Sequence, residues 1–149
     1  MPRSLPGQWM RRAGLILLLG VLAVMGRGWA VESGSSSGSE WEREVLELFE
    51  NRRSGEMVAV AGLVDRVLAD DNAGSRHQRF IVRLESGHTL LVAHNIDLAR
   101  RVPLEVGDSV AVLGQYEWND RGGVLHWTHH DPDGVRPGGW VEWNGARYR

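Results

Sequence analysis

The sequence predicts a single all-β domain with one N-terminal helix. Apolar residues recur with a period of two in five separate runs, and glycine-containing turn segments divide these runs. The one segment with a helical period precedes all of them. Because a β-sandwich usually needs about seven strands, five runs favour a five-stranded barrel that resembles the OB-fold.

The helix is expected from Glu40 to Arg52. Ser39 followed by Glu42 fits a capping box, in which the two side chains satisfy backbone N–H groups of the first turn. The apolar residues that follow have the spacing of one helical face; they are Trp41, Val45, Leu48 and Phe49.

The strands are expected at residues 57–68, 78–84, 89–96, 106–116 and 124–130. Gly62 lies inside the first of them, where a glycine would let a long strand bend and serve both layers of the barrel. A short helical connection is expected over residues 97–102. Residues 132–149 are expected to fold back onto the barrel through three aromatic anchors, which are Trp140, Trp143 and Tyr148.

Residues 1–30 are interpreted as a secretory signal peptide. Three arginines precede the apolar run of residues 13–26, and Gly28-Trp29-Ala30 supplies the small residues that a signal peptidase reads. Residues 31–39 are then a flexible linker and residues 40–149 one OB-like domain. The prediction is an exported protein, periplasmic or secreted, and the alternative is an inner-membrane anchor formed by residues 13–26.

The predicted mature domain is acidic. Residues 1–30 hold four of the 17 basic residues and none of the 19 acidic ones, so the remainder has 13 arginines and a net charge of −6. Such a domain is a poor non-specific binder of nucleic acid, because that affinity depends on neutralising phosphates. The chain contains no cysteine, which excludes a disulfide framework. A monomer is expected.

Three imidazoles and a carboxylate fall within residues 126–131. On an extended strand, residues i and i+2 share a face about 6.6 Å apart, so His129 and Asp131 form the best metal-chelating pair. His77 or His94 would supply a third ligand, and zinc or another divalent metal suits such donors. The alternative interpretation is that these histidines make structural hydrogen bonds at the rim of the barrel.

A ligand site is predicted across the second and third strands. OB-folds bind ligands there, between the loops that join strands 1–2 and 4–5, which correspond here to residues 70–76 and 119–123. The predicted ligand-binding residues are His77, Arg79, His94, Asn95, Trp118, Asn119, His126 and His130. The ligand would be a small molecule, an oligosaccharide, an oligonucleotide or a partner protein.

Several strings of residues resemble an uncharacterised bacterial family, a domain of unknown function of small exported proteins. They are residues 77–84 (HQRFIVRL), 94–99 (HNIDLA), 116–119 (YEWN), 122–132 (GGVLHWTHHDP) and 138–140 (GGW). The resemblance covers about residues 41–148 and implies an exported location and one small domain, with no known activity. Arg136 departs from the pattern, because His is expected there.

Two functions are therefore considered. The first is a small exported binding module with a His/Trp/Asn-lined ligand site, with no membrane contact beyond the signal segment. The alternative is a small metal-dependent hydrolase, acting on phosphodiesters through the His129/Asp131 cluster. No catalytic sequence signature is present to support the enzyme.

Overall fold

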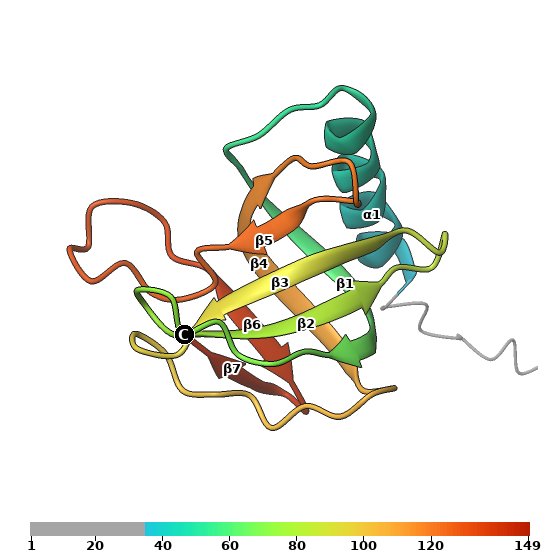
Figure 1. The fold of residues 1–149 in the computed structure, drawn as a ribbon. Coiled ribbons are helices and arrows are strands. Elements are labelled where there is room, and N and C mark those ends of the chain that lie inside the picture. Colours follow the sequence, from blue (N-terminus) through green and yellow to red (C-terminus); the bar gives the residue numbers. More distant parts are fainter. Residues whose placement is uncertain (1–34) are drawn as a thin grey trace, which may run out of the picture. The chain divides into compact units, whose positions relative to one another are not determined.

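The computed structural model describes residues 35–149 (Figure 1). The predictions for residues 1–30 lie outside the described residues. The described chain forms one helix and seven strands: α1 (Ser35–Glu50), β1 (Glu56–Val67), β2 (His77–Arg83), β3 (Thr89–Asn95), β4 (Ser109–Glu117), β5 (Val124–His126), β6 (Trp140–Trp143) and β7 (Ala146–Tyr148). The one helix in this part of the chain, α1, is not long and apolar enough to cross a membrane.

Five of the strands close into a barrel. The hydrogen-bonded order is β1-β2-β3-β5-β4, and β4 pairs again with β1 to complete the ring. All of these pairings are antiparallel except the one between β3 and β5. β6 pairs with β4, and β7 with β6, outside the ring. The prediction of an OB-fold-like five-stranded barrel with one N-terminal helix is confirmed.

β1 serves both halves of the barrel. Its residues 56–63 pair with β4, whereas residues 63–67 pair with β2, and the register to β2 shifts between Val64 and Arg66. Gly62 lies where the strand changes partner. A Cβ atom at Gly62 would come within 2.4 Å of the Arg83 carbonyl oxygen. The glycine is therefore required for close approach of the two backbones.

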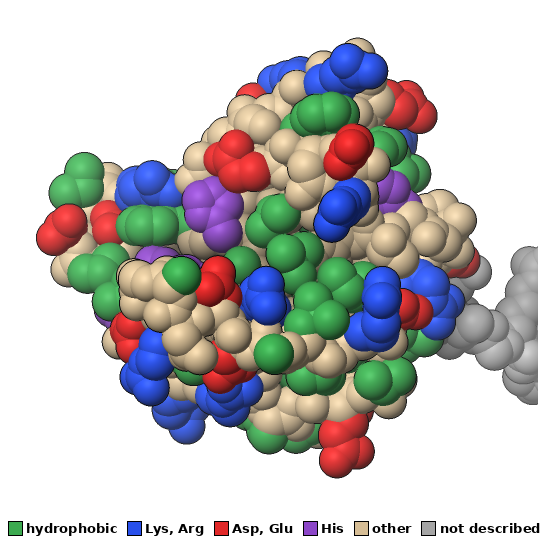
Figure 2. All heavy atoms as spheres, viewed as in Figure 1, with side chains coloured by type: hydrophobic (Ala, Val, Ile, Leu, Met, Phe, Trp, Pro, Cys, Tyr) green, Lys and Arg blue, Asp and Glu red, His purple; other side chains and the backbone are tan. Residues whose placement is uncertain are grey.

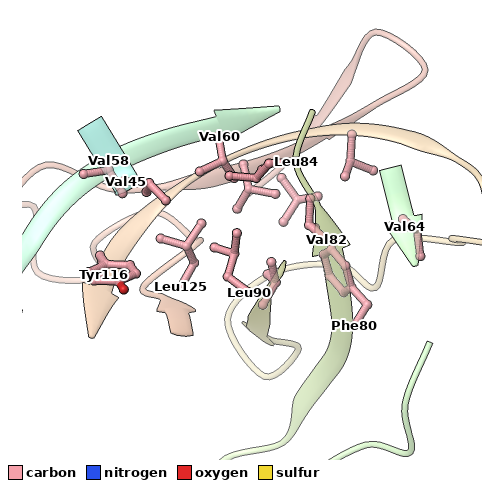
Figure 3. Packing of buried hydrophobic residues seen from close by; sticks show 14 of the residues in the cluster. Val45, Val58, Val60, Val64, Phe80, Val82, Leu84, Leu90, Tyr116 and Leu125 are labelled. Carbon is pink, nitrogen blue, oxygen red and sulfur yellow. The ribbon is translucent and has the colours of Figure 1, made fainter. Parts of the chain in front are cut away.

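The core fills the barrel and extends to α1. Valine and leucine side chains dominate it, and Phe80 and Tyr116 are the largest of its members that are fully buried. Val45 and Leu48 of α1 are buried in the same cluster, and Figure 3 shows Val45 beside Val58 at one end of it. The apolar stripe of the helix thus packs on the barrel.

The segment of residues 97–102 is a turn followed by irregular chain, so the helical connection predicted there is wrong. Its polar groups are satisfied by other means. The side chain of Gln78 donates to the Val102 carbonyl at 2.7 Å and accepts from the Val102 N–H at 2.9 Å. Asp97 accepts from the backbone N–H of Arg76 at 2.8 Å and caps no helix.

Some element boundaries also differ from the prediction. α1 begins at Ser35 instead of Glu40. β5 ends at His126 instead of continuing to His130, because Trp127 has a φ of 56°, which lies in the left-handed region and interrupts an extended strand. The tail folds back as expected, but it does so as the hairpin of β6 and β7.

We predict that Gly62→Ala lowers the free energy of unfolding by about 1–3 kcal/mol, the usual cost of overpacking a close contact. The added methyl group would meet the Arg83 backbone, which cannot move without disturbing the pairing of β1 with β2. Chemical denaturation measures the effect. Gly38→Ala is the matched control, because nothing lies within 4 Å of the added atom and alanine favours a helix. Equal stability of the two variants would contradict the prediction.

Candidate functional site

Strand alternation divides the predicted ligand-binding residues of β2 and β3 between two faces. His77 and Arg79 on β2 and Asn95 on β3 are half-buried and face outward, and His77 pairs directly with Asn95. His94 is fully buried and faces the core. A ligand on the outer face would therefore meet the first three residues but not His94.

The outer face of β2 and β3 carries a groove of about 400 Å³. We call it the β2–β3 groove. Its aliphatic lining comes from Leu68, Ile81, Leu90 and Leu91, its polar lining from Arg66, Arg79, Thr89, Asn119 and Arg121, and Gly123 completes it. It contains no aspartate or glutamate. Figure 2 shows hydrophobic side chains at the centre of this face and basic side chains beside them. Three of its lining residues, Asn119, Arg121 and Gly123, belong to one of the two loops predicted to flank the site, residues 119–123, and none belongs to the other, residues 70–76.

The three arginines of the groove keep most of their donors available. Arg79 uses its Nε to donate to the Ala69 carbonyl at 2.9 Å. Arg66 has only a loose contact with Asp65, at 3.7 Å, and its side chain is 70% exposed. No partner of the Arg121 guanidinium is found among residues 35–149. These groups can accept an anionic ligand without first breaking a strong internal ion pair.

Asn119 shapes one end of the groove. Its Oδ1 accepts from the backbone N–H groups of Arg121 at 2.8 Å and Gly123 at 3.1 Å. Gly122 and Gly123 have φ values of 109° and 100°, which agrees with the turn predicted here. Asn119 therefore holds the β4–β5 loop in place, and it lines the groove where Arg121 projects from that loop.

His94 connects three segments inside the barrel. Its Nδ1 lies 2.8 Å from Thr128 Oγ1, and its Nε2 lies 3.1 Å from the Arg100 carbonyl oxygen. A carbonyl only accepts, so Nε2 carries the proton and Nδ1 accepts from the Thr128 hydroxyl. Burial lowers the pKa of His94 below 6.5, which keeps the imidazole neutral. The residue has no free nitrogen for a ligand.

The residues of the predicted metal site are engaged elsewhere. His129 Nδ1 donates to the His130 carbonyl at 2.7 Å. Asp131 Oδ2 accepts from the backbone N–H groups of Val135 at 2.7 Å and Arg136 at 2.8 Å. His77 Nδ1 lies 2.8 Å from the Ser75 carbonyl oxygen. No group of three or more His, Cys, Asp or Glu residues within the described range is arranged to hold a metal ion.

The histidines nevertheless gather at one end of the barrel. His77 and His129 each help to lower the pKa of His94, and His77 also lowers that of His129, although burial is the largest cause for both groups. His126 lies apart, with its Nε2 3.4 Å from Glu117 Oε1, and His130 is exposed. These charge effects indicate that His77, His94 and His129 lie near one another, and each of the three makes a hydrogen bond within the protein.

Trp118, which was predicted to bind a ligand, and Trp127 both lie outside the groove lining and make structural hydrogen bonds. Trp118 donates from Nε1 to the Phe49 carbonyl at 3.0 Å and attaches the end of α1 to the barrel. Trp127 is half-buried, and its Nε1 donates to the Pro137 carbonyl at 3.2 Å. No aromatic side chain lines the β2–β3 groove.

The predicted ligand-binding residues include only Arg79 and Asn119 of the groove lining. Among the lining residues that the sequence analysis missed are Arg66, Ile81, Leu91 and Arg121. Alternation from Arg79 places Ile81 on the outer face, and alternation from Asn95 does the same for Leu91, so the sequence held this signal. The arginines gave no signal, because arginine occurs throughout the chain and only the fold brings these two together.

The chain matches the family model described as "Protein of unknown function (DUF3465)" over residues 31–149, and it belongs to that family. This confirms the resemblance to an uncharacterised domain of unknown function. A comparison with curated proteins found no match.

We predict that the protein loses stability as the pH falls below about 6.5, because the unfolded chain then binds protons that folded His94 and His129 resist. The stability is fully present above the unfolded pKa and declines toward the lowered folded pKa. His94→Gln should reduce this pH dependence, and it should cost about 1–3 kcal/mol at pH 7.5 by leaving buried partners unsatisfied.

Denaturant titrations at several pH values test this prediction. His126→Gln is the control, because that side chain is 40% exposed and makes only a 3.4 Å contact. An unchanged pH dependence in His94→Gln would show that His94 does not carry the effect.

Proposed function

We propose that this protein is a small binding module, and that the β2–β3 groove binds ligands that carry acidic groups beside aliphatic ones. One observation carries the proposal: three arginines and no carboxylate surround an aliphatic floor. Guanidinium groups bind carboxylates and phosphates in a bidentate manner. The floor would contact the apolar part of the same ligand.

The charge of the groove is opposite to that of the predicted mature domain, whose net charge is −6. Some arginines elsewhere on the surface pair closely with carboxylates; for example, Arg76 binds Asp97 at 2.7 Å and Arg147 binds Glu142 at 2.8 Å. In the groove, the guanidinium groups of Arg79 and Arg121 have no carboxylate partner within the described residues, and Arg66 has only the 3.7 Å contact with Asp65. Positive potential in a groove attracts anionic ligands and orients them.

An acidic peptide segment of a partner protein fits the groove better than the other ligands considered. Single-stranded nucleic acid is usually held by bases stacked on aromatic side chains, which this groove lacks. Oligosaccharides offer few aliphatic groups for Leu68, Ile81 and Leu91. A peptide can combine carboxylates with aliphatic side chains, which match the arginines and the aliphatic floor of the groove in character.

The hydrolase alternative has less support. It required His129 and Asp131 to share one face of a strand, but β5 ends before them and both side chains hold local backbone groups. Export, with action in the periplasm or outside the cell, remains a proposal that rests on residues 1–30 of the sequence.

We predict that Arg121→Glu weakens binding of a fluorescein-labelled peptide of alternating glutamate and leucine by about tenfold, which corresponds to about 1.4 kcal/mol. The charge reversal places a carboxylate at the groove without breaking an internal contact of that guanidinium. Fluorescence anisotropy measures the affinity, which should also fall as salt is added. Arg43→Glu is the control, because Arg43 is exposed on α1 and lies outside the groove lining.

Equal losses of peptide affinity in the Arg121→Glu and Arg43→Glu variants would mean that only net charge matters. They would refute the proposal that the groove is the binding site. A labelled oligothymidylate that binds more tightly than the peptide would refute the proposed ligand class.

A further inference from the structure

The segment that joins β5 to β6 forms a loop, residues 131–137, which protrudes from the barrel at the left of Figure 1. We call it the 131–137 loop. All of its residues after Asp131 are exposed, and Val135 is 86% exposed, the highest value among the large hydrophobic residues of the described chain. A single exposed valine is ordinary. This loop is unusual because many internal contacts hold it in place although its residues are exposed.

The loop is organised from inside by one carboxylate. Asp131 accepts backbone N–H groups from Asp133, Val135 and Arg136, at 3.4, 2.7 and 2.8 Å. Its carbonyl also accepts from the N–H of Gly134 at 3.1 Å. These hydrogen bonds lower the pKa of Asp131, so the carboxylate stays charged and the turn persists across the physiological pH range.

The base of the loop is fixed by an aromatic stack. The Arg136 guanidinium lies 3.8 Å from the centre of the Trp127 ring, and the His129 ring lies 4.6 Å from that of Trp127. Arg136 also donates to Gln115 Oε1 of β4 at 2.6 Å. The guanidinium therefore points back to the barrel and leaves the tip of the loop without a basic group.

Two glycines let the loop return close to the barrel. A Cβ atom at Gly139 would lie 2.3 Å from the carbonyl oxygens of both Leu113 and Trp127, and one at Gly138 would lie 2.8 Å from His130 Cα. The Gly139 N–H donates to the His129 carbonyl at 2.8 Å. The histidine-containing residues 126–131 thus contact the end of this loop and hold it close to the barrel.

All of these contacts fix a loop whose residues stay in solvent. A loop held in one conformation loses little entropy when a partner binds it, which increases affinity. Its tip combines the aliphatic Val135 with the carboxylate of Asp133. The β2–β3 groove has the complementary character, with an aliphatic floor and arginines at its rim.

We propose that the 131–137 loop of one molecule docks in the β2–β3 groove of a second copy of this chain. This inference rests on the groove proposed above as a binding site. Val135 would contact the floor formed by Ile81 and Leu91, and Asp133 would face Arg121. The second copy is thereby a specific case of an acidic, aliphatic peptide ligand.

The loop and the groove are different surfaces, so the contact is heterologous, and each molecule keeps one free loop or groove. One loop in a groove of about 400 Å³ makes a small interface. Interfaces below about 1,200 Å² are typically weak and transient. Association is therefore expected only at high concentration, with a dissociation constant on the order of 0.1–1 mM.

Sedimentation equilibrium of the protein purified from expressing cells tests the proposal. The wild type should show a weight-average mass that rises with concentration. Val135→Asp and Arg121→Glu should each reduce the association constant at least about tenfold. An equimolar mixture of the two variants should regain association but stop at a pair, because one supplies an intact groove and the other an intact loop.

Arg43→Glu is again the control and should associate like the wild type. A wild type that remains monomeric up to millimolar concentration would overturn the inference, and so would a mixture of the two variants that fails to pair. If the glutamate–leucine peptide binds in an Arg121-dependent manner while the wild type stays monomeric, the groove function stands and only self-recognition is refuted. If neither is observed, both proposals fail.

Discussion

β1 is the strand on which the barrel depends, because it pairs with β4 over its first part and with β2 over its second. The exchange of partners occurs at Gly62, where the backbones approach too closely for any side chain. Because the ring is closed, β2 and β3 are each paired on both sides, and neither has a free strand edge. The β2–β3 groove lies on this face, and its lining is completed by Arg66 and Leu68 from the end of β1 and by Asn119, Arg121 and Gly123 of the β4–β5 loop.

The histidines show how a dense group of polar side chains can serve architecture. Strand pairing between β3 and β5 covers only two residue pairs, so the chain beyond His126 needs other contacts to stay on the barrel. His94 supplies one through Thr128, and the Gly139–His129 backbone hydrogen bond supplies another. Buried polar groups must be paired, and here the pairing joins segments that no strand ladder holds.

Much of the fold could be predicted from the sequence, because period-two runs and Gly62 are local signals. The prediction that strand two pairs with strand three also brought His77 to Asn95, as observed. The end of β5 could not be predicted, since a positive φ at Trp127 is imposed by its surroundings and no glycine marks it. The metal-chelating pair failed to form a cluster for the same reason, because His129 and Asp131 are not on a strand.

The candidate site was predicted in part. Of the residues predicted to bind a ligand, only Arg79 and Asn119 line the β2–β3 groove. His94 could have been excluded, because alternation from Leu90 and Val92 places it in the core. Arg66 and Arg121 come from distant parts of the chain, and only the closed ring brings them to one rim.

The net charge of the predicted domain limits how the groove can work. At physiological ionic strength, charges are screened beyond about 8 Å, so an acidic partner experiences the net −6 of the domain weakly until it is close. Near the surface, the guanidinium groups of Arg66, Arg79 and Arg121 would dominate and orient the proposed partner. Such exposed charges contribute little lasting affinity. Slow dissociation of the proposed partner would then depend on aliphatic contact with Ile81 and Leu91. A pre-organised loop with an exposed valine therefore suits the groove better than a flexible acidic chain would.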